Sequence, residues 1–267
     1  MVNSINAWIG AMRLRTLPLS ISGIIVGSAL AYSYGSWDAF IFSSAISTTV
    51  LFQILSNLAN DFGDSQKGTD NDQRLGPDRA VQSGAISLLQ MKIAVGLVSL
   101  LSLLSASLLI FLSSHLLSPS AIWIYFGLAV ISIVAAITYT VGKSAYGYFG
   151  LGDVMVFLFF GFLSIIGVFG LYGEPFRMIL ILPAITIGLW SAAVLNLNNM
   201  RDIDNDRNSE KRTLVVFLGA INAKYYHLFL ILFGFLSWSF FIVQLYVSEN
   251  NPFLYFALIP SFWIFRH

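Results

Sequence analysis

Residues 93–113 (IAVGLVSLLSLLSASLLIFLS) decide the fold of this chain. This run contains no charged residue, and residues 120–141 form a second run without one. A membrane-spanning helix needs roughly 20 apolar residues, because about 30 Å of hydrocarbon is crossed at 1.5 Å per residue. Each run therefore predicts one membrane-spanning helix. The serines and the proline of residues 113–120 predict the turn between them.

The composition of the whole chain agrees with a membrane protein. Of its 267 residues, 57% are hydrophobic and 10% are charged, whereas a typical soluble domain has about 25% charged residues. The chain has no cysteine, which excludes disulfide frameworks, thiolate metal sites and cysteine nucleophiles. The net charge of +1 argues against a nucleic-acid partner.

The gaps between charged residues predict about eight membrane-spanning helices. The other six lie at about 17–34 and 40–60, within the gaps 153–174, 177–201 and 224–249, and at 253–265. Lipid offers no hydrogen bonds, so such segments must form helices or closed barrels, and their length without alternating polar residues selects helices. We therefore expect an all-α polytopic transmembrane helical bundle, with residues 1–267 forming a single integral-membrane domain.

The distribution of basic residues predicts the orientation of this bundle. If every predicted helix crosses once, twelve of the fourteen Lys and Arg residues share the side of the N-terminus, and the opposite loops hold only Arg177. Loops on the cytoplasmic side of membrane proteins carry an excess of Lys and Arg. We therefore expect a multi-pass protein of the cell (cytoplasmic) membrane with a cytoplasmic N-terminus.

Two polar segments, residues 57–84 and 196–216, carry nine of the thirteen acidic residues, and both lie on the predicted cytoplasmic side. Each begins at the end of an apolar run and contains asparagine and aspartate at helical spacing. Side chains spaced in this way project from one face of a helix. The two sets are Asn57, Asp61 and Asp64, and Asn198, Asp202 and Asp206.

Carboxylates at this spacing repel one another, so a cation must offset them. Hard oxygen ligands suit Mg²⁺, which usually takes one or two carboxylates together with substrate phosphates. One such segment alone would more often be a solvated connector, but two matched sets on one side favour a site for a Mg²⁺-bound diphosphate at the membrane surface. Nearby basic residues suited to phosphate oxygens are Lys67, Arg74, Arg79, Lys211 and Arg212.

Four ordered motifs resemble the UbiA superfamily of intramembrane prenyltransferases. They are residues 13–20 (RLRTLPLS), residues 53–79 with the first aspartate set, residues 146–153 (YGYFGLGD), and the second aspartate set with residues 211–214 (KRTL). They are most similar to the motifs of the members that prenylate 1,4-dihydroxy-2-naphthoate. Leu14 replaces a proline of the family pattern and Glu210 a glycine. The family usually has nine helices, so we expect this chain to be truncated at its C-terminus.

The resemblance implies a Mg²⁺-dependent transfer of a polyprenyl group from a polyprenyl diphosphate to 1,4-dihydroxy-2-naphthoate. The reaction would release CO₂ and give demethylmenaquinone, in menaquinone biosynthesis. The implied Mg²⁺ ligands are the two sets Asn57, Asp61, Asp64 and Asn198, Asp202, Asp206. The implied substrate-binding residues are Asn57, Asn198, Arg13, Arg74, Arg79, Lys211 and Arg212, with Tyr139, Tyr146 and Tyr148 as an aromatic wall.

Lys143 and Asp153 are added to the four aspartates as implied catalytic residues for carboxylate binding or proton handling. Each of these basic and acidic residues could instead have a purely structural role. Arg13 and Lys143 could be basic anchors at the membrane interface, and Asp153 could be a helix-start residue favoured by the helix dipole.

Three other functions remain open at this point. The first is prenyl transfer to another acceptor, such as 4-hydroxybenzoate. The second is a membrane transporter, although transporters place ionisable groups near the bilayer midplane, and here the span centres are uncharged. The third is a CDP-alcohol phosphotransferase, whose expected D-G-x-x-A-R run is absent. Prenyl chain length and oligomeric state are not determined by the sequence.

Overall fold

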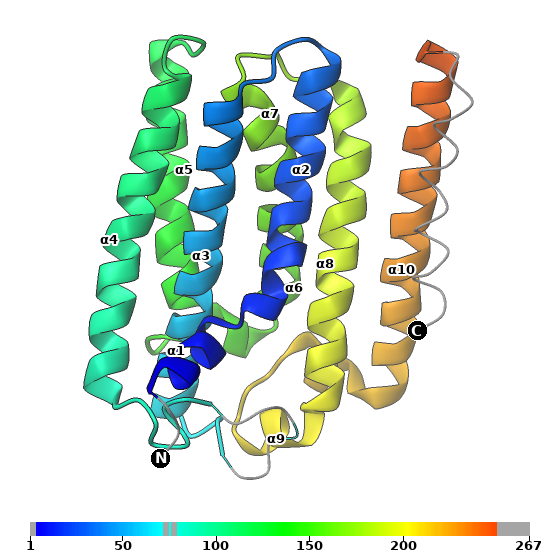
Figure 1. The fold of residues 1–267 in the computed structure, drawn as a ribbon. Helices are drawn as coiled ribbons and strands as arrows, with labels where there is room; N and C mark the ends of the chain where they lie inside the picture. Colours follow the sequence, from blue (N-terminus) through cyan, green and yellow to red (C-terminus); the bar gives the residue numbers. More distant parts are fainter. Residues whose placement is uncertain (1–3, 72–74, 76–78, 250–267) are drawn as a thin grey trace.

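In the computed structural model, which describes residues 4–71, 75 and 79–249, long helices run side by side between two ends of a bundle (Figure 1). Within these residues, seven helical segments are long and apolar enough to cross a membrane, so the predicted all-α membrane bundle is confirmed. The predicted eighth span, residues 253–265, lies outside the described residues. The crossing elements are α2 (Leu17–Ser33), α3 (Ala39–Gln66), α4 (Leu88–Ser113), α5 (Pro119–Thr138), the segment Gly152–Leu171, α8 (Ile181–Arg201) and α10 (Leu214–Glu249).

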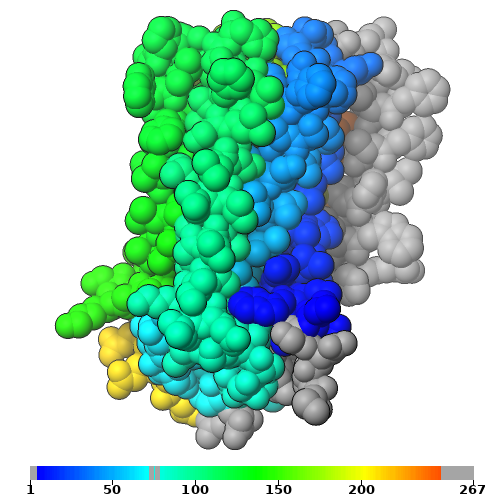
Figure 2. Space-filling model, turned by 60° about the vertical axis from the view of Figure 1, so that its left-hand side comes forward, coloured from blue at the N-terminus to red at the C-terminus, as the bar shows by residue number. Residues whose placement is uncertain are grey.

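Shorter elements gather at the lower end of the bundle in Figure 1, where the two aspartate segments also lie. The N-terminal helix α1 crosses this end instead of continuing the direction of α2, as the space-filling view also shows (Figure 2). The short elements at this end are α1 (Ser4–Met12), η1 (Leu14–Thr16), η2 (Tyr146–Phe149) and α9 (Ile203–Asn208).

Local capping residues place the starts of the long helices. Asp38 accepts hydrogen bonds from the backbone N–H groups of Phe40 and Ile41 at 2.8 and 2.9 Å, and α3 begins directly after it. Ser87 and Gln90 form a reciprocal capping box at the start of α4, which satisfies N–H groups that lack partners inside the helix. Helix α4 therefore begins five residues earlier than the charge-free run predicts.

Helix α3 extends through Gln66, six residues beyond the span predicted at 40–60. Its last turns remain helical because residues of the following loop pack against them. Leu58 of α3 and Ile86 of the loop belong to one buried apolar cluster together with Met91 of α4. This packing fixes the first aspartate set on a rigid helix end.

The fifth span is irregular, with a π-helical segment η3 (Phe157–Gly167) between the short helices α6 (Gly152–Val156) and α7 (Val168–Leu171). The backbones of η3 and α8 approach so closely that a Cβ added at Gly161 would lie 2.3 Å from the carbonyl oxygen of Ala184. Small residues permit such close packing of membrane helices. The wider π-helical turn, common near functional sites, faces the inner cavity described below.

The prediction that Asn198, Asp202 and Asp206 share one continuous helix is wrong. Helix α8 ends at Arg201 and α9 begins at Ile203, so Asp202 lies at the junction. Hydrogen bonds still connect the N–H of Asp202 to Asn198 O and the N–H of Asp206 to Asp202 O. The two-helix arrangement turns the chain across the lower end of the bundle, toward the first aspartate segment (Figure 1).

Candidate active site

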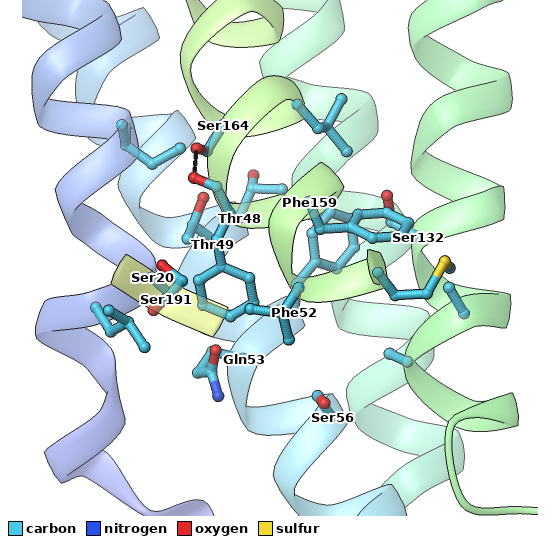
Figure 3. A pocket seen from close by; sticks show the side chains of 18 of the residues that line it. Ser20, Thr48, Thr49, Phe52, Gln53, Ser56, Ser132, Phe159, Ser164 and Ser191 are labelled. Carbon is cyan, nitrogen blue, oxygen red and sulfur yellow. Dashed lines mark hydrogen bonds between the residues drawn. The ribbon is translucent and has the colours of Figure 1, made fainter. Parts of the chain in front are cut away.

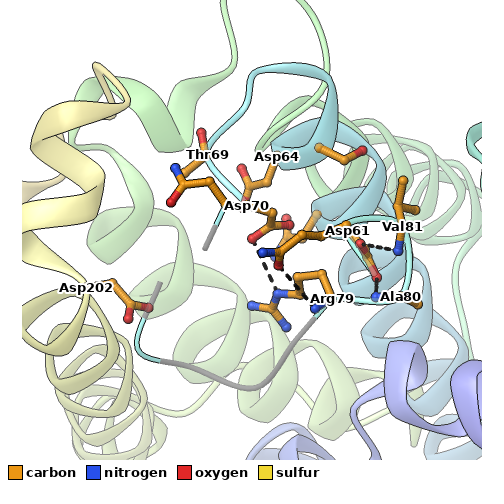
Figure 4. Close-up of polar contacts among 12 residues, drawn as sticks. Asp61, Asp64, Thr69, Asp70, Arg79, Ala80, Val81 and Asp202 are labelled. Carbon is orange, nitrogen blue, oxygen red and sulfur yellow. Dashed lines mark hydrogen bonds and ion pairs between the residues drawn. The ribbon is translucent and has the colours of Figure 1, made fainter. Parts of the chain in front are cut away.

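The first aspartate set lies at the end of α3, and all three of its side chains are buried. Asp61 accepts hydrogen bonds from the backbone N–H groups of Ala80 at 3.1 Å and Val81 at 3.4 Å (Figure 4). A buried carboxylate requires such donors because its desolvation is costly. The loop after α3 thus supplies the donors that hold Asp61 in place.

Asp64 connects the first segment to two distant parts of the chain. One carboxylate oxygen accepts a 2.7 Å hydrogen bond from the hydroxyl of Tyr148, and the other lies 3.2 Å from Nζ of Lys211. Tyr148 belongs to η2, and Lys211 follows the second aspartate segment. Asp64 is therefore the residue at which three motifs of the sequence meet.

Lys211 lies between the two aspartate segments. Burial opposes its charge, but the carboxylates of Asp64 and Asp206 outweigh burial and hold the pKa of Lys211 above its usual value. A second contact between the segments is the side-chain amide of Asn205, which donates to the backbone oxygen of Thr69 at 2.9 Å. The two segments therefore form one polar cluster through residues that lie more than 130 positions apart in the sequence.

Two lysines, Lys67 and Lys211, also lie close to the ring of Tyr148. Nζ of Lys67 lies 3.8 Å from the ring centroid and Nζ of Lys211 lies 5.3 Å from it, distances at which a cation is attracted to an aromatic face. Burial lowers the pKa of Lys67, Asp64 counteracts this effect, and Lys211 adds to it. Two ammonium groups beside one buried carboxylate provide positive charge suited to phosphate oxygens.

The second aspartate segment is held differently. Asp202, which lies across the cluster from Asp61 and Asp64 in Figure 4, is paired with its neighbour Arg201 through two contacts of 2.9 and 2.6 Å. Arg201 also donates to Asn198 Oδ1 at 3.4 Å. Arg201 therefore contacts two of the three predicted metal ligands in this segment, Asn198 and Asp202.

Arg13 and Asn57 form the corner where the N-terminal helix meets α3. The side-chain amide of Asn57 donates to the backbone oxygen of Met12 at 2.9 Å. Arg13 has a φ of 48°, a left-handed conformation that costs roughly 1–2 kcal/mol for a residue with a Cβ. Its guanidinium interacts electrostatically with Asp61 and Asp64. Such strain at a charged residue that contacts the inner cavity favours a functional position.

Next to this cluster, the bundle contains a cavity of about 360 Å³. Its lower end is polar, with Arg13, Asn57, Asn60, Tyr139 and Asn198 in its lining. Further up, Figure 3 shows hydroxyl and amide side chains around its middle, namely Ser20, Thr49, Gln53, Ser56 and Ser191. Its far end is apolar and is lined by Ile24, Leu109, Ile110, Val168 and Leu171.

The aromatic residues predicted as a wall lie partly in this cavity. Tyr139 and Tyr146 line it and meet edge to face with centroids 5.3 Å apart. Burial raises the pKa of Tyr139 to about 12, so its phenol stays protonated at neutral pH. Tyr148 instead faces Asp64 and the two lysines.

Other predicted site residues lie elsewhere. Lys143 and Arg212 are exposed. Asp153 is buried but is not part of the cavity lining, and it accepts a 3.4 Å hydrogen bond from the hydroxyl of Tyr226 on α10. Arg74 lies outside the described residues.

Arg79 pairs with a residue that the site prediction did not include. Its Nε lies 3.6 Å from Asp70 Oδ1, and its charge also acts on Asp61. Arg201, Thr69 and Asn205 were likewise missed as site residues, whereas Lys67 was predicted as a partner for phosphate oxygens. Thr69 and Asp70 belong to the K-G-T-D run of the first motif, so that run was the available signal for both.

Among the described residues, no three His, Cys, Asp or Glu side chains lie together as a formed metal site. The donors nevertheless fit a hard divalent cation in their chemistry. The polar cluster contains four buried aspartates, namely Asp61, Asp64, Asp202 and Asp206. The buried Oδ1 of Asn205, between the two segments, has no hydrogen-bond partner. A cation that replaced Lys or Arg at these carboxylates would find oxygen ligands there.

Comparison with known proteins agrees with this architecture. The UbiA prenyltransferase family matches residues 20–267. The chain is 46% identical over 226 residues to the 1,4-dihydroxy-2-naphthoate octaprenyltransferase of Escherichia coli (strain K12), covering 85% of this chain and 73% of that protein. It is 41% identical over 263 residues to the protein of the same name from Haemophilus influenzae, covering 97% and 84%. The chain therefore belongs to the UbiA prenyltransferase family.

Proposed function

We propose that this chain transfers an octaprenyl group from octaprenyl diphosphate to 1,4-dihydroxy-2-naphthoate, giving demethylmenaquinol (the reduced form of demethylmenaquinone), diphosphate and CO₂. The observation that carries the proposal is one continuous arrangement. A polar cluster built from two aspartate segments adjoins the polar end of a cavity whose far end is apolar. Such a site suits a substrate with a diphosphate head and a hydrocarbon tail. The names of the two similar bacterial enzymes supply the acceptor and the chain length.

The basic residues of the cluster bind the diphosphate in this proposal. Lys67 and Lys211 stand beside Asp64, and Arg13 lies in the cavity lining beside the same carboxylates. Positive charge placed where the leaving group gains negative charge lowers the barrier to breaking the allylic C–O bond. Charge neutralisation on the diphosphate is also the chemistry that Mg²⁺ supplies when it is bound. Its proposed ligands are Asn57, Asp61, Asp64, Asn198, Asp202 and Asp206.

The cavity provides the second half of the mechanism. When the C–O bond breaks, its electron pair leaves with the diphosphate and an allylic cation remains. The rings of Tyr139 and Tyr146 line this part of the cavity, where they shield the cation from water and offer π-faces to it. The carboxyl-bearing ring carbon of the acceptor then forms the new C–C bond. Loss of CO₂ returns its bonding pair to the ring and restores aromaticity.

We further propose that the site faces the cytoplasm of the cell membrane. The loops at the aspartate end carry nearly all lysines and arginines, whereas the described loops at the other end carry Arg177 alone, which matches the positive-inside distribution. Lys143, although exposed, is then an interfacial anchor or a residue that the acceptor's carboxylate reaches from outside the cavity.

A transfer assay tests the proposed function. Membranes containing the chain would be supplied with octaprenyl diphosphate and either 1,4-dihydroxy-2-naphthoate or 4-hydroxybenzoate, with Mg²⁺ or with EDTA. With the first acceptor we expect demethylmenaquinol, or demethylmenaquinone after its oxidation by air, to be detected by mass spectrometry, and we expect this product to be lost with EDTA. Product from 4-hydroxybenzoate alone would contradict the acceptor. Substrate uptake into vesicles without conversion would contradict the enzyme class.

A further inference from the structure

A second cavity lies beyond the inner cavity, toward the opposite end of the bundle. The second cavity has a volume of about 340 Å³ and lies among the loops after α4 and α7. Tyr125 of α5 lines both cavities. Apart from Tyr125, the two linings share no residue, so its ring stands at the boundary between them.

The ring of Tyr125 is fixed against the fifth span. Its hydroxyl donates a 2.8 Å hydrogen bond to the backbone oxygen of Gly167, where η3 ends. A Cβ added at Gly170 would lie 2.4 Å from the same hydroxyl oxygen. The glycine thus leaves room for the phenol, and the hydrogen bond satisfies its polar end in apolar surroundings.

The two sides of this boundary differ in chemistry. On the inner side lie Leu109, Val168 and Leu171, which suit a hydrocarbon chain. On the outer side Ser118 and Glu174 join apolar residues in the lining. Inner-cavity residues extend along α5 from Tyr125 to its C-cap residue Tyr139, which corresponds to about 21 Å at 1.5 Å per residue.

We propose that the ring of Tyr125 ends the prenyl-binding cavity and thereby sets how much of the prenyl chain the bundle can bury. This inference rests on the proposed function, because it takes the inner cavity as the site of the prenyl chain. A chain whose head lies at the aspartate cluster extends toward Tyr125. A short chain ends before it, and a long chain must turn aside between helices.

Chain-length preference tests this role. The ratio of kcat/KM for octaprenyl diphosphate to that for geranyl diphosphate would be measured for the wild type and two opposite variants. Tyr125→Ala opens the boundary, and we expect the ratio to rise about tenfold because further methylene groups become buried. Ala129→Phe fills the lining one helical turn closer to the aspartate cluster. We expect the ratio to fall about tenfold while geranyl transfer persists.

Two further variants separate cavity length from general damage. Trp123, two residues from Tyr125 on the same helix, is 74% exposed on the outer surface of the bundle. Trp123→Ala should leave both substrates unchanged. Tyr125→Phe keeps the ring and should keep the wild-type ratio, although it removes the hydrogen bond to Gly167.

An unchanged ratio in both Tyr125→Ala and Ala129→Phe would overturn the inference, and so would an equal loss with both substrates. Those results would leave the proposed function standing, because wild-type transfer is measured in the same experiment. If the wild type transfers neither prenyl group to any acceptor, the proposed function itself fails, and this inference fails with it.

Discussion

The two aspartate segments resemble each other in sequence but are held in different ways. At the end of α3, Asp61 and Asp64 receive hydrogen bonds from backbone N–H groups, a tyrosine and a distant lysine. At the α8–α9 junction, Asp202 is paired with the adjacent Arg201. The two aspartates of the first segment are therefore positioned by tertiary contacts, whereas Asp202 of the second segment is paired with its own neighbour in sequence. We infer that Asp61 and Asp64 are preorganised, whereas Asp202 must exchange its arginine for substrate or metal.

The largest expected effect comes from breaking the preorganised segment. Asp61→Asn keeps the shape of the side chain but removes its charge, and we expect kcat/KM to fall about 1,000-fold or more, or roughly 4 kcal/mol of transition-state stabilisation. The measurement is prenyl transfer by purified protein in detergent, with its melting temperature as a check of folding. Asp204→Asn is the matched control, because Asp204 lies in the other aspartate segment with its side chain 89% exposed. Equal activity of Asp61→Asn and wild type would contradict the role of Asp61.

The next effect concerns the link between the segments. Lys211→Met leaves Asp64 buried without its cation, and breaking a buried ion pair costs about 3–5 kcal/mol. We expect a clear drop in thermal stability together with a loss of transfer. Lys211→Arg should restore part of the stability. A melting temperature equal to that of the wild type would show that Lys211 does not hold the two segments together.

In the second segment we expect a smaller change in stability, and tighter cation binding instead of a loss of activity. The Arg201 side chain is 35% exposed, so the pair with Asp202 contributes about 1 kcal/mol at most. Arg201→Gln should barely change stability but should remove the arginine that competes with a cation for Asp202. Titration with Mn²⁺, followed by electron paramagnetic resonance, should show tighter binding than in the wild type. Weaker binding would mean that Arg201 supports the metal ligands instead of competing with the metal.

The smallest expected effect is a change of KM and of stability with pH that arises from the titration of Lys67. Because burial lowers the pKa of Lys67 below its usual value of 10.5, its charge is lost at a lower pH than that of an ordinary lysine. KM for the prenyl diphosphate should therefore begin to rise below pH 10.5. Stability should rise slightly over the same pH window, since the unfolded chain retains that proton more strongly. Lys67→Arg should move the rise of KM to higher pH, and an unchanged profile would exclude Lys67 as its source.

Much of the fold could be predicted from the sequence because charges are rare in the spans. The charge-free gaps located all seven spans within the described residues. The residues at which the helices end were less predictable. The sequence predicted that the second span ends before Asp61 and Asp64, yet α3 continues through them, because residues 80–86 bury this part of the helix. Such burial depends on contacts from elsewhere in the chain, which local composition does not reveal.

The candidate site was predictable in its residue types but not in its pairings. Both aspartate sets were found from their spacing. The hydrogen-bond and ion-pair partners of Asp64 could not be found in this way, because Tyr148 and Lys211 meet Asp64 only after the chain has folded. Asp153 was expected near the reacting groups, but it faces Tyr226 of α10. Sequence spacing identifies one face of a helix, and only tertiary packing decides which neighbour that face meets.

The central claim is that the two aspartate segments form a single site through Asp64 and Lys211. A double-mutant cycle of Asp64→Asn and Lys211→Met, measured as unfolding free energy in detergent, tests this claim most directly. Residues in direct contact show interaction energies of about 0.5–3 kcal/mol, and for this buried pair we predict more than about 1.5 kcal/mol of non-additivity. Additive losses would contradict the account, because the two segments would then be independent of each other.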